Sequence, residues 1–134
     1  MILNLFTDGA SRGNPGHAGI GIVLQSSQNE TIDDYCEYIG VSTNNVAEYK
    51  GLIKGLKIAK KHNPSGLNVY LDSELIIRQM QGKYKVKNET LKAYFEFANE
   101  LISDLKNVKF KHIPREMNQI ADKLANQAID KAQK

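Results

Sequence analysis

The chain has 134 residues, of which 41% are hydrophobic and 25% are charged, as is typical of one soluble globular domain. Its net charge of +3 is mildly basic, which permits a polyanionic partner without requiring one. The single cysteine, Cys36, excludes an internal disulfide and fits a reducing compartment. Because no apolar run approaches membrane length and no signal-peptide pattern is present, we expect one cytoplasmic domain over residues 1–134.

The first part of the chain predicts three strands. Residues 3–7 are apolar on both faces, as in a buried central strand, and Asp8 stands at its expected end. A glycine-rich turn follows over residues 9–16. Two further strands are expected over residues 18–24 and 31–41, joined by a polar turn. Connections this short predict an antiparallel meander.

A helix is expected next. Residues 42–45 are all good N-cap residues, and apolar side chains recur behind them at helical spacing as far as Ala59. Gly51 and Gly55 weaken a helix, so we expect them to permit close packing on the sheet. A fourth strand is expected over residues 67–71, and a second aspartate, Asp72, follows it directly.

Two helices, a strand and a final helix complete the pattern. Ser73 is expected to cap a short helix that runs through Met80, and Asn88 to cap a strongly amphipathic one. A last strand is expected around residues 108–113, and Asn118 is expected to cap the final helix. The order βββαβααβα predicts an α/β fold, a mixed five-stranded sheet with helices on both faces.

Four acidic residues stand at the ends of these elements: Asp8 and Asp72 after strands, Glu48 and Asp122 near helix starts. Each has an ordinary explanation, because Asp favours turns and carboxylates suit helix N-termini. However, sites in sheets of this kind gather beyond the strand ends, where all four could converge. The sequence therefore predicts one acidic crevice.

An acidic crevice points to metal chemistry. Clustered carboxylates repel one another and raise each other's pKa, so the cluster needs cations. All-oxygen ligands select hard ions such as Mg²⁺, and two such ions clamp the reacting oxygens of a phosphodiester. No Ser-His-Asp order, Cys-His pair or zinc spacing competes, and the glycine-rich turn lacks the ending of a P-loop. The pattern favours metal-dependent phosphoryl transfer.

Four motifs occur in one order along nearly the whole chain. They are Phe6-Thr7-Asp8-Gly9 with Gly13-Asn14-Pro15-Gly16, Thr43-Asn44-Asn45-Val46-Ala47-Glu48, Leu71-Asp72-Ser73, and Asn118-Gln119-Ile120-Ala121-Asp122-Lys123-Leu124-Ala125. This set resembles type 1 ribonuclease H. The resemblance implies a sheet of order 3-2-1-4-5 and endonucleolytic hydrolysis of the RNA strand of RNA–DNA hybrids, leaving 3′-hydroxyl and 5′-phosphate ends.

The resemblance also implies roles for the site residues. The metal-binding catalytic set would be Asp8, Glu48, Asp72 and Asp122, with two Mg²⁺ ions and Mn²⁺ as a substitute. Asp8 would bridge both ions, Glu48 and Asp72 would hold one, and Asp122 the other. By the same resemblance Gly9 would belong to the metal site, and its backbone, with Glu48, would meet RNA 2′-hydroxyls.

Further residues would bind substrate by the same resemblance. Asn14, Asn44 and Asn45 match the family's minor-groove readers, and Thr43 matches part of its DNA-phosphate pocket. These residues could equally be present because they form turns and cap helices, and such a structural role is compatible with substrate binding. Glu74 stands where many members place a glutamine against the RNA.

Two departures from the longer members place the chain in a short, archaeal-like subgroup. Residues 110–118 are too few for the loop that carries a catalytic histidine, and we expect His112 to belong to the last strand. Arg115 or Glu116 is the expected substitute. The basic protrusion is also missing, and residues 82–87 stand in its place, with three lysines around Tyr84. These lysines could contact phosphates of the substrate, or they could simply form a solvated connector, and the sequence does not decide between the two roles.

Two rival functions are considered. The first is an inactive binding module on the same fold, which retention of all four acids disfavours. The second is another nuclease or recombinase, which the Thr-Asn-Asn and Asn-Pro-Gly motifs disfavour. We expect a monomer that acts on RNA–DNA hybrid, and activity on RNA–RNA duplex is left open.

Overall fold

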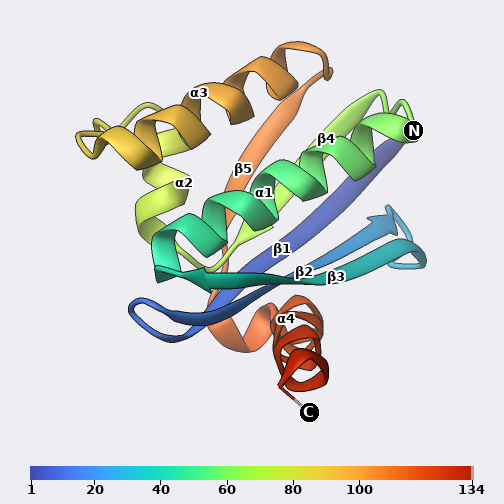
Figure 1. The fold of residues 1–134 in the computed structure, drawn as a ribbon. Coiled ribbons are helices and arrows are strands. Elements are labelled where there is room, and N and C mark those ends of the chain that lie inside the picture. The colour runs from blue at the N-terminus through green and yellow to red at the C-terminus, as the bar shows by residue number, and fades with distance from the viewer. Residues whose placement is uncertain (134) are drawn as a thin grey trace.

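The computed structural model describes residues 1–133 and shows a twisted sheet with helices on both faces (Figure 1). The strands are β1 (Ile2–Gly13), β2 (Gly16–Ser26), β3 (Thr31–Ser42), β4 (Gly66–Leu71) and β5 (Val108–His112). Their order is β3-β2-β1-β4-β5, with β1 antiparallel to β2, β2 antiparallel to β3, and the β1–β4 and β4–β5 pairs parallel. The predicted fold class and strand order are confirmed.

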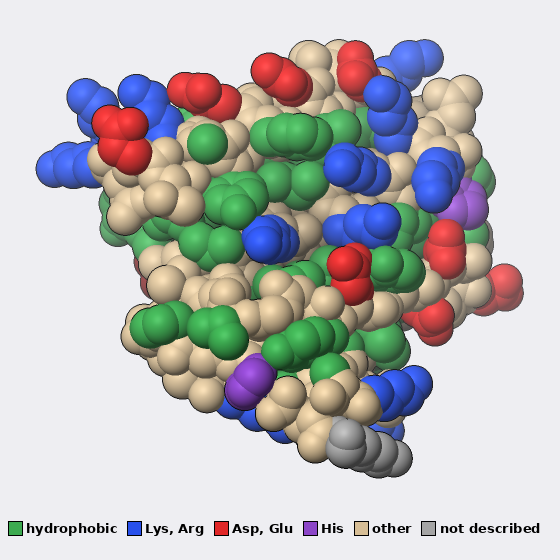
Figure 2. Space-filling view, viewed as in Figure 1, with side chains coloured by type: hydrophobic (Ala, Val, Ile, Leu, Met, Phe, Trp, Pro, Cys, Tyr) green, Lys and Arg blue, Asp and Glu red, His purple; other side chains and the backbone are tan. Residues whose placement is uncertain are grey.

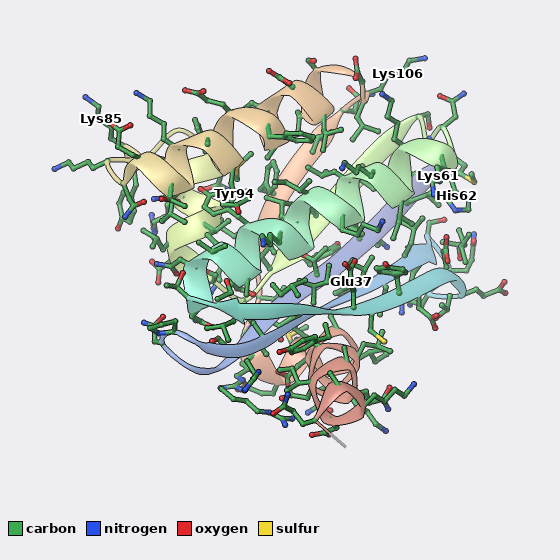
Figure 3. All side chains as sticks on the ribbon, in the orientation of Figure 1. Glu37, Lys61, His62, Lys85, Tyr94 and Lys106 are labelled. Atoms are coloured by element: carbon green, nitrogen blue, oxygen red, sulfur yellow. The ribbon has the colours of Figure 1, made fainter. Side chains whose placement is uncertain are left out.

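Helices cover the two faces unequally. They are α1 (Asn44–Lys61), α2 (Glu74–Met80), α3 (Glu89–Ser103) and α4 (Gln119–Ala132), with a 3₁₀ turn, η1 (Arg115–Met117), before α4. On one face α1 lies along β1 with α3 beside it, and on the other face α4 lies against β2 (Figure 1). The main core fills the space between the sheet, α1 and α3, where Tyr94 of α3 points toward α1 (Figure 3).

The first strand is longer than the sequence predicts. Asp8 does not end it, because β1 continues to Gly13 while paired with β2. Pairing of β1 with its other neighbour, β4, stops at Phe6. Asp8 therefore stands where β4 leaves the sheet rather than where β1 ends. The same long hairpin starts β2 at Gly16, so that His17 lies within this strand.

Two glycines allow the helices to approach the sheet closely. A Cβ atom on Gly9 of β1 would lie 2.2 Å from the carbonyl carbon of Ala47 in α1. One on Gly21 of β2 would lie 2.0 Å from the carbonyl oxygen of Ala121 in α4. No other residue type fits these contacts without moving a helix. Because Glu48 follows Ala47 and Asp122 follows Ala121, the two glycines set the depth of two of the predicted acids.

The outer surface of α1 carries lysines, as is typical of a solvated helix face. Figure 2 shows Lys and Arg side chains over α1 with apolar side chains between them. Two of these lysines lie over aromatic rings, Lys54 over Tyr35 at 4.9 Å and Lys57 over Phe97 at 5.0 Å. Among residues 1–133, no helix has both the length and the apolar character needed to cross a membrane.

Candidate active site

All four predicted acids line one pocket of about 270 Å³. They come from four parts of the fold: Asp8 from β1, Glu48 from α1, Asp72 from the turn after β4, and Asp122 from the first turn of α4. The full lining is Asp8, Gly9, Ala10, Ser11, Asn44, Glu48, Asp72, Arg115 and Asp122. The structure thus brings the four acids into the single crevice that the sequence predicts.

Three of the acids are close enough to share an ion. Asp8, Glu48 and Asp72 each offer a carboxylate oxygen, and these oxygens lie within 4.8 Å of one another. Asp8 is 6% exposed and Glu48 is 4% exposed, whereas the side chain of Asp122 is 29% exposed. The Gly9 backbone N–H donates to Glu48 Oε1, which orients that carboxylate beside Asp8.

Burial perturbs the two innermost acids in the absence of cations. Burial, followed by the neighbouring Glu48 carboxylate, raises the pKa of Asp8 well above its usual 3.8. Burial likewise raises the pKa of Glu48 above its usual 4.5, although hydrogen bonds from Asp8 and Gly9 partly offset this. The pair therefore holds a proton when no cation compensates its charge. An all-oxygen donor set of this density fits Mg²⁺ or Mn²⁺.

Asn118 has a role that the sequence does not reveal. It occupies the N-cap position of α4, as predicted, but its side chain makes no capping hydrogen bond. Its Nδ2 instead donates to the Thr7 carbonyl oxygen at 2.9 Å and to Asp72 Oδ2 at 3.3 Å. By contrast, the predicted caps Thr43, Ser73 and Asn88 each accept from a backbone N–H in the first turn.

The two residues predicted to replace the missing loop histidine, Arg115 and Glu116, lie in different cavities. Arg115 lines the carboxylate pocket, and its Nη2 lies 3.9 Å from Asp122 Oδ1. Glu116 lines a different cavity of about 150 Å³, between the sheet and the start of α4. His112 lies in β5, as predicted, with an exposed side chain. Of the two predicted residues, Arg115 therefore lies beside the carboxylates and Glu116 does not.

All of the expected substrate-binding residues except Glu74 line one of two pockets. Asn44 lines the carboxylate pocket, and its backbone N–H donates to Asn14 Oδ1 at 3.0 Å. A second pocket, of about 300 Å³, lies between the β1–β2 hairpin and the starts of α1 and α3, and is lined by Asn14, Thr43, Asn45, Val46, Asn88, Thr90 and Leu91. Its two helix N-termini point positive dipole ends at the same space, which suits an anion.

Two polar residues of this second pocket, Asn88 and Thr90, are absent from the substrate-binding set that the sequence predicts. Asn88 is recognisable only as a helix cap, which conceals its position opposite Thr43. Glu74, by contrast, is predicted to bind substrate but lines neither pocket. Its carboxylate instead pairs with Arg78 at 2.8 Å.

A sheet of order 3-2-1-4-5 with acids gathered where β4 leaves the side of β1 defines a domain of the ribonuclease-H-like class. Comparison with known proteins agrees, since the family model described as reverse transcriptase-like matches residues 6–128. The ribonuclease H of Coxiella burnetii is 33% identical over 147 residues, covering 99% of this chain and 93% of that protein. The chain belongs to the ribonuclease H family.

Two further comparisons describe the relation in more detail. The bifunctional protein Rv2228c of Mycobacterium tuberculosis is 43% identical over 126 residues, which is 93% of this chain but 35% of that protein. The chain thus spans about a third of that relative's length. The solved structure of LC11-RNase H1, from compost, in complex with RNA/DNA hybrid has a TM-score of 0.95 and 45% identity, covering 98% of this chain and 99% of that one.

Proposed function

We propose that this chain is a metal-dependent endonuclease that hydrolyses the RNA strand of RNA–DNA hybrids and leaves 3′-hydroxyl and 5′-phosphate ends. The observation that carries the proposal is the convergence of four carboxylates from four elements in one pocket, in a chain of the ribonuclease H family. Hybrid as substrate is supported by the RNA/DNA complex of a structural relative that this chain matches over nearly its whole length.

The carboxylates fit two divalent ions, with Mg²⁺ as the physiological choice and Mn²⁺ as a substitute. Asp8 would contact both ions, Glu48 and Asp72 would hold one, Asp122 the other, with Gly9 at the edge of the site. When bound, such ions activate the attacking water and neutralise the charge that develops on the leaving 3′ oxygen. The protein's own contribution is to hold the carboxylates close together in a largely buried position, so that they bind cations strongly.

Strand discrimination would come from the pocket wall. Glu48 and Gly9 both line the carboxylate pocket, and we expect them to recognise the 2′-hydroxyl that RNA has and DNA lacks. Asn44 lines the carboxylate pocket and Asn14 and Asn45 line the second pocket, and we expect all three to contact the minor groove of the hybrid. Glu74, held by Arg78, contributes least to this set.

The second pocket would hold a phosphate of the DNA strand. Thr43 caps α1 and Asn88 caps α3, so the pocket between them faces the N-terminal ends of two helices. A phosphate there gains from both helix dipoles without any lysine in the lining. Anchoring one strand in this pocket would place the other strand over the carboxylates.

The rival functions make different demands. Burying Asp8 and Glu48 beside each other raises their pKa values and costs folding free energy. An inactive binding module would gain nothing from this cost, because it has no reaction that needs the two carboxylates. We further propose that the protein acts as a cytoplasmic monomer, and RNA–RNA duplex is tested below as a second substrate.

The test uses purified protein with Mg²⁺ or Mn²⁺ and end-labelled RNA–DNA hybrid beside RNA–RNA and DNA–DNA duplexes. Internal cuts in the RNA strand of the hybrid, absent in EDTA, are expected. Products should carry 3′-hydroxyl ends that a polymerase extends. Cleavage of DNA–DNA duplex, or digestion that proceeds only from an end, would contradict the proposal.

A further inference from the structure

The three aspartates of the carboxylate pocket, Asp8, Asp72 and Asp122, come from separate elements. Asn118 forms a hydrogen bond with Asp72, with Asp122 and with the residue before Asp8. Its Nδ2 donates to the carbonyl oxygen of Thr7, the residue directly before Asp8. The same nitrogen donates to Asp72 Oδ2 at 3.3 Å. Its backbone carbonyl oxygen accepts from the N–H of Asp122 at 3.1 Å. One residue therefore links β1, the turn after β4, and α4 at the pocket.

The environment of Asn118 shows that its amide is placed for these contacts. The residue is 1% exposed, and within residues 1–133 its Oδ1 is buried without a hydrogen-bond partner. A buried acceptor without a partner is unfavourable, so the oxygen does not explain why an amide stands here. The nitrogen does, because one NH₂ group supplies both donors.

No similar side chain would make the same two bonds. An aspartate at this position would direct a carboxylate toward the Thr7 carbonyl oxygen and the Asp72 carboxylate, both of which are acceptors. A serine offers a single donor, and an alanine offers none. An amide thus satisfies both acceptors without adding charge to a site that already holds four carboxylates.

We propose that Asn118 is a positioning residue that fixes Asp72 relative to Asp8 and thereby sets the affinity of the carboxylate pocket for divalent cations. This rests on the proposed function, in which those carboxylates hold the ions. With Asp72 Oδ2 held by the amide, the other carboxylate oxygen is directed to a cation with little loss of side-chain freedom. Groups that orient metal ligands in this way typically change metal affinity or activity by about 10–100-fold when removed.

The experiment compares Asn118→Ala and Asn118→Ser with a matched control, Asn68→Ala. Asn68 Nδ2 donates to Asn4 Oδ1 at 3.1 Å. The control therefore also removes a side-chain hydrogen bond from an amide, here between β4 and β1 and outside both site pockets. Mn²⁺ binding is measured by calorimetry without nucleic acid, melting temperature is measured in EDTA, and kcat and KM are measured across Mg²⁺ concentrations.

For Asn118→Ala we expect the Mn²⁺ dissociation constant to rise at least tenfold and the Mg²⁺ concentration for half-maximal rate to rise with it. The KM for hybrid should stay within twofold, and Asn118→Ser should lie between alanine and the wild type. Asn68→Ala should leave the Mn²⁺ affinity unchanged, even if it lowers the melting temperature as much as Asn118→Ala does.

Three results would overturn the proposal. One is a folded Asn118→Ala protein that binds Mn²⁺ within twofold of the wild type, and another is an equal loss of affinity in Asn68→Ala. The third is failure of both Asn118 variants to fold, which would make the residue structural. A wild-type protein that binds no Mn²⁺ would instead reject the metal site itself, and this inference with it.

Discussion

The carboxylate pocket and the connector between α2 and α3, residues 81–88, differ in how firmly the fold holds them. The pocket is built by residues from β1, α1, α4 and the turn after β4, and its acids are largely withdrawn from water. In the connector the lysines Lys83, Lys85 and Lys87 are all exposed, and Lys85 projects beside the start of α3 (Figure 3). Only Val86 of this segment is buried.

This contrast separates chemistry from affinity. Buried acids need a fixed geometry, because a cation binds them only when several oxygens are already close together. Exposed lysines attract a polyanion at longer range and with little geometric demand, and salt screens them. Changes in the pocket should therefore abolish the reaction, whereas changes in the connector should weaken binding gradually.

The largest effect is expected for Asp72→Asn, which keeps the size of the side chain and removes its charge. Loss of a metal ligand should lower kcat by about 10³-fold or more, since metal ions supply several kcal/mol of transition-state stabilisation. Folding should survive, because removing one of the clustered carboxylates relieves repulsion. Cleavage rate, hybrid affinity and melting temperature are measured on one preparation.

Asp34→Asn is the matched control for this change, because Asp34 is an exposed aspartate on β3 outside the pocket. It should leave the cleavage rate within twofold. An Asp72→Asn protein that unfolds would show that Asp72 is structural, and one that cleaves normally would place the active site elsewhere.

Much of the pocket could be predicted because each acid stands in a local pattern. Asp8 and Asp72 follow apolar runs, and Glu48 and Asp122 follow cap residues, so four short stretches suffice. Asn118 could not be predicted, since its partners are 111 and 46 residues away and its type also suits a helix cap. The extent of β1 was hidden for a related reason, because pairing with β2 carries the strand through a turn-like glycine sequence.

The next effect concerns the wall of the pocket. Arg115→Ala should lower kcat by up to about tenfold, because its guanidinium lies 3.9 Å from Asp122 but is 79% exposed, so that it orients this carboxylate only weakly. Glu116→Ala, one residue further on and in a different cavity, should change kcat less than twofold. Single-turnover rates at saturating Mg²⁺ measure both. Equal loss in the two variants would show that η1 matters only as a whole, and loss in His112→Ala alone would mean that the acid-base group lies on β5.

In the connector, changing Lys83, Lys85 and Lys87 together to alanine should raise KM for hybrid by on the order of tenfold at moderate salt, with kcat within twofold. The slope of the logarithm of the binding constant against the logarithm of the salt concentration should also become shallower, by an amount that corresponds to the loss of up to three phosphate contacts. The matched control is a triple alanine variant of Lys50, Lys54 and Lys57, which removes the same charge from the outer face of α1. If both triples raise KM equally, the connector acts only through net charge.

The smallest expected effect is a pH-dependent change in stability that belongs to the pocket alone. Burial, and in Asp8 also the neighbouring Glu48, raises the pKa values of Asp8 and Glu48 above 3.8 and 4.5. Without metal, the folded state therefore holds more protons than the unfolded state at pH values above about 4. Stability from these groups is greatest below that pH and falls as the pH rises toward their folded pKa values.

A divalent cation should reverse this trend, because it replaces the proton as the partner of the carboxylates. We expect saturating Mg²⁺ to raise the melting temperature by on the order of 5 °C at pH 8 and by much less at pH 5. Asp8→Asn should raise the melting temperature in EDTA at pH 8 and should remove most of the Mg²⁺ effect, which separates this site from every other titrating group. Thermal unfolding at both pH values, with Mg²⁺ and with EDTA, measures all of these terms. An equal Mg²⁺ effect at pH 5 and pH 8 would mean that the cation binds without displacing a proton, and that the buried pair is already charged in the free protein.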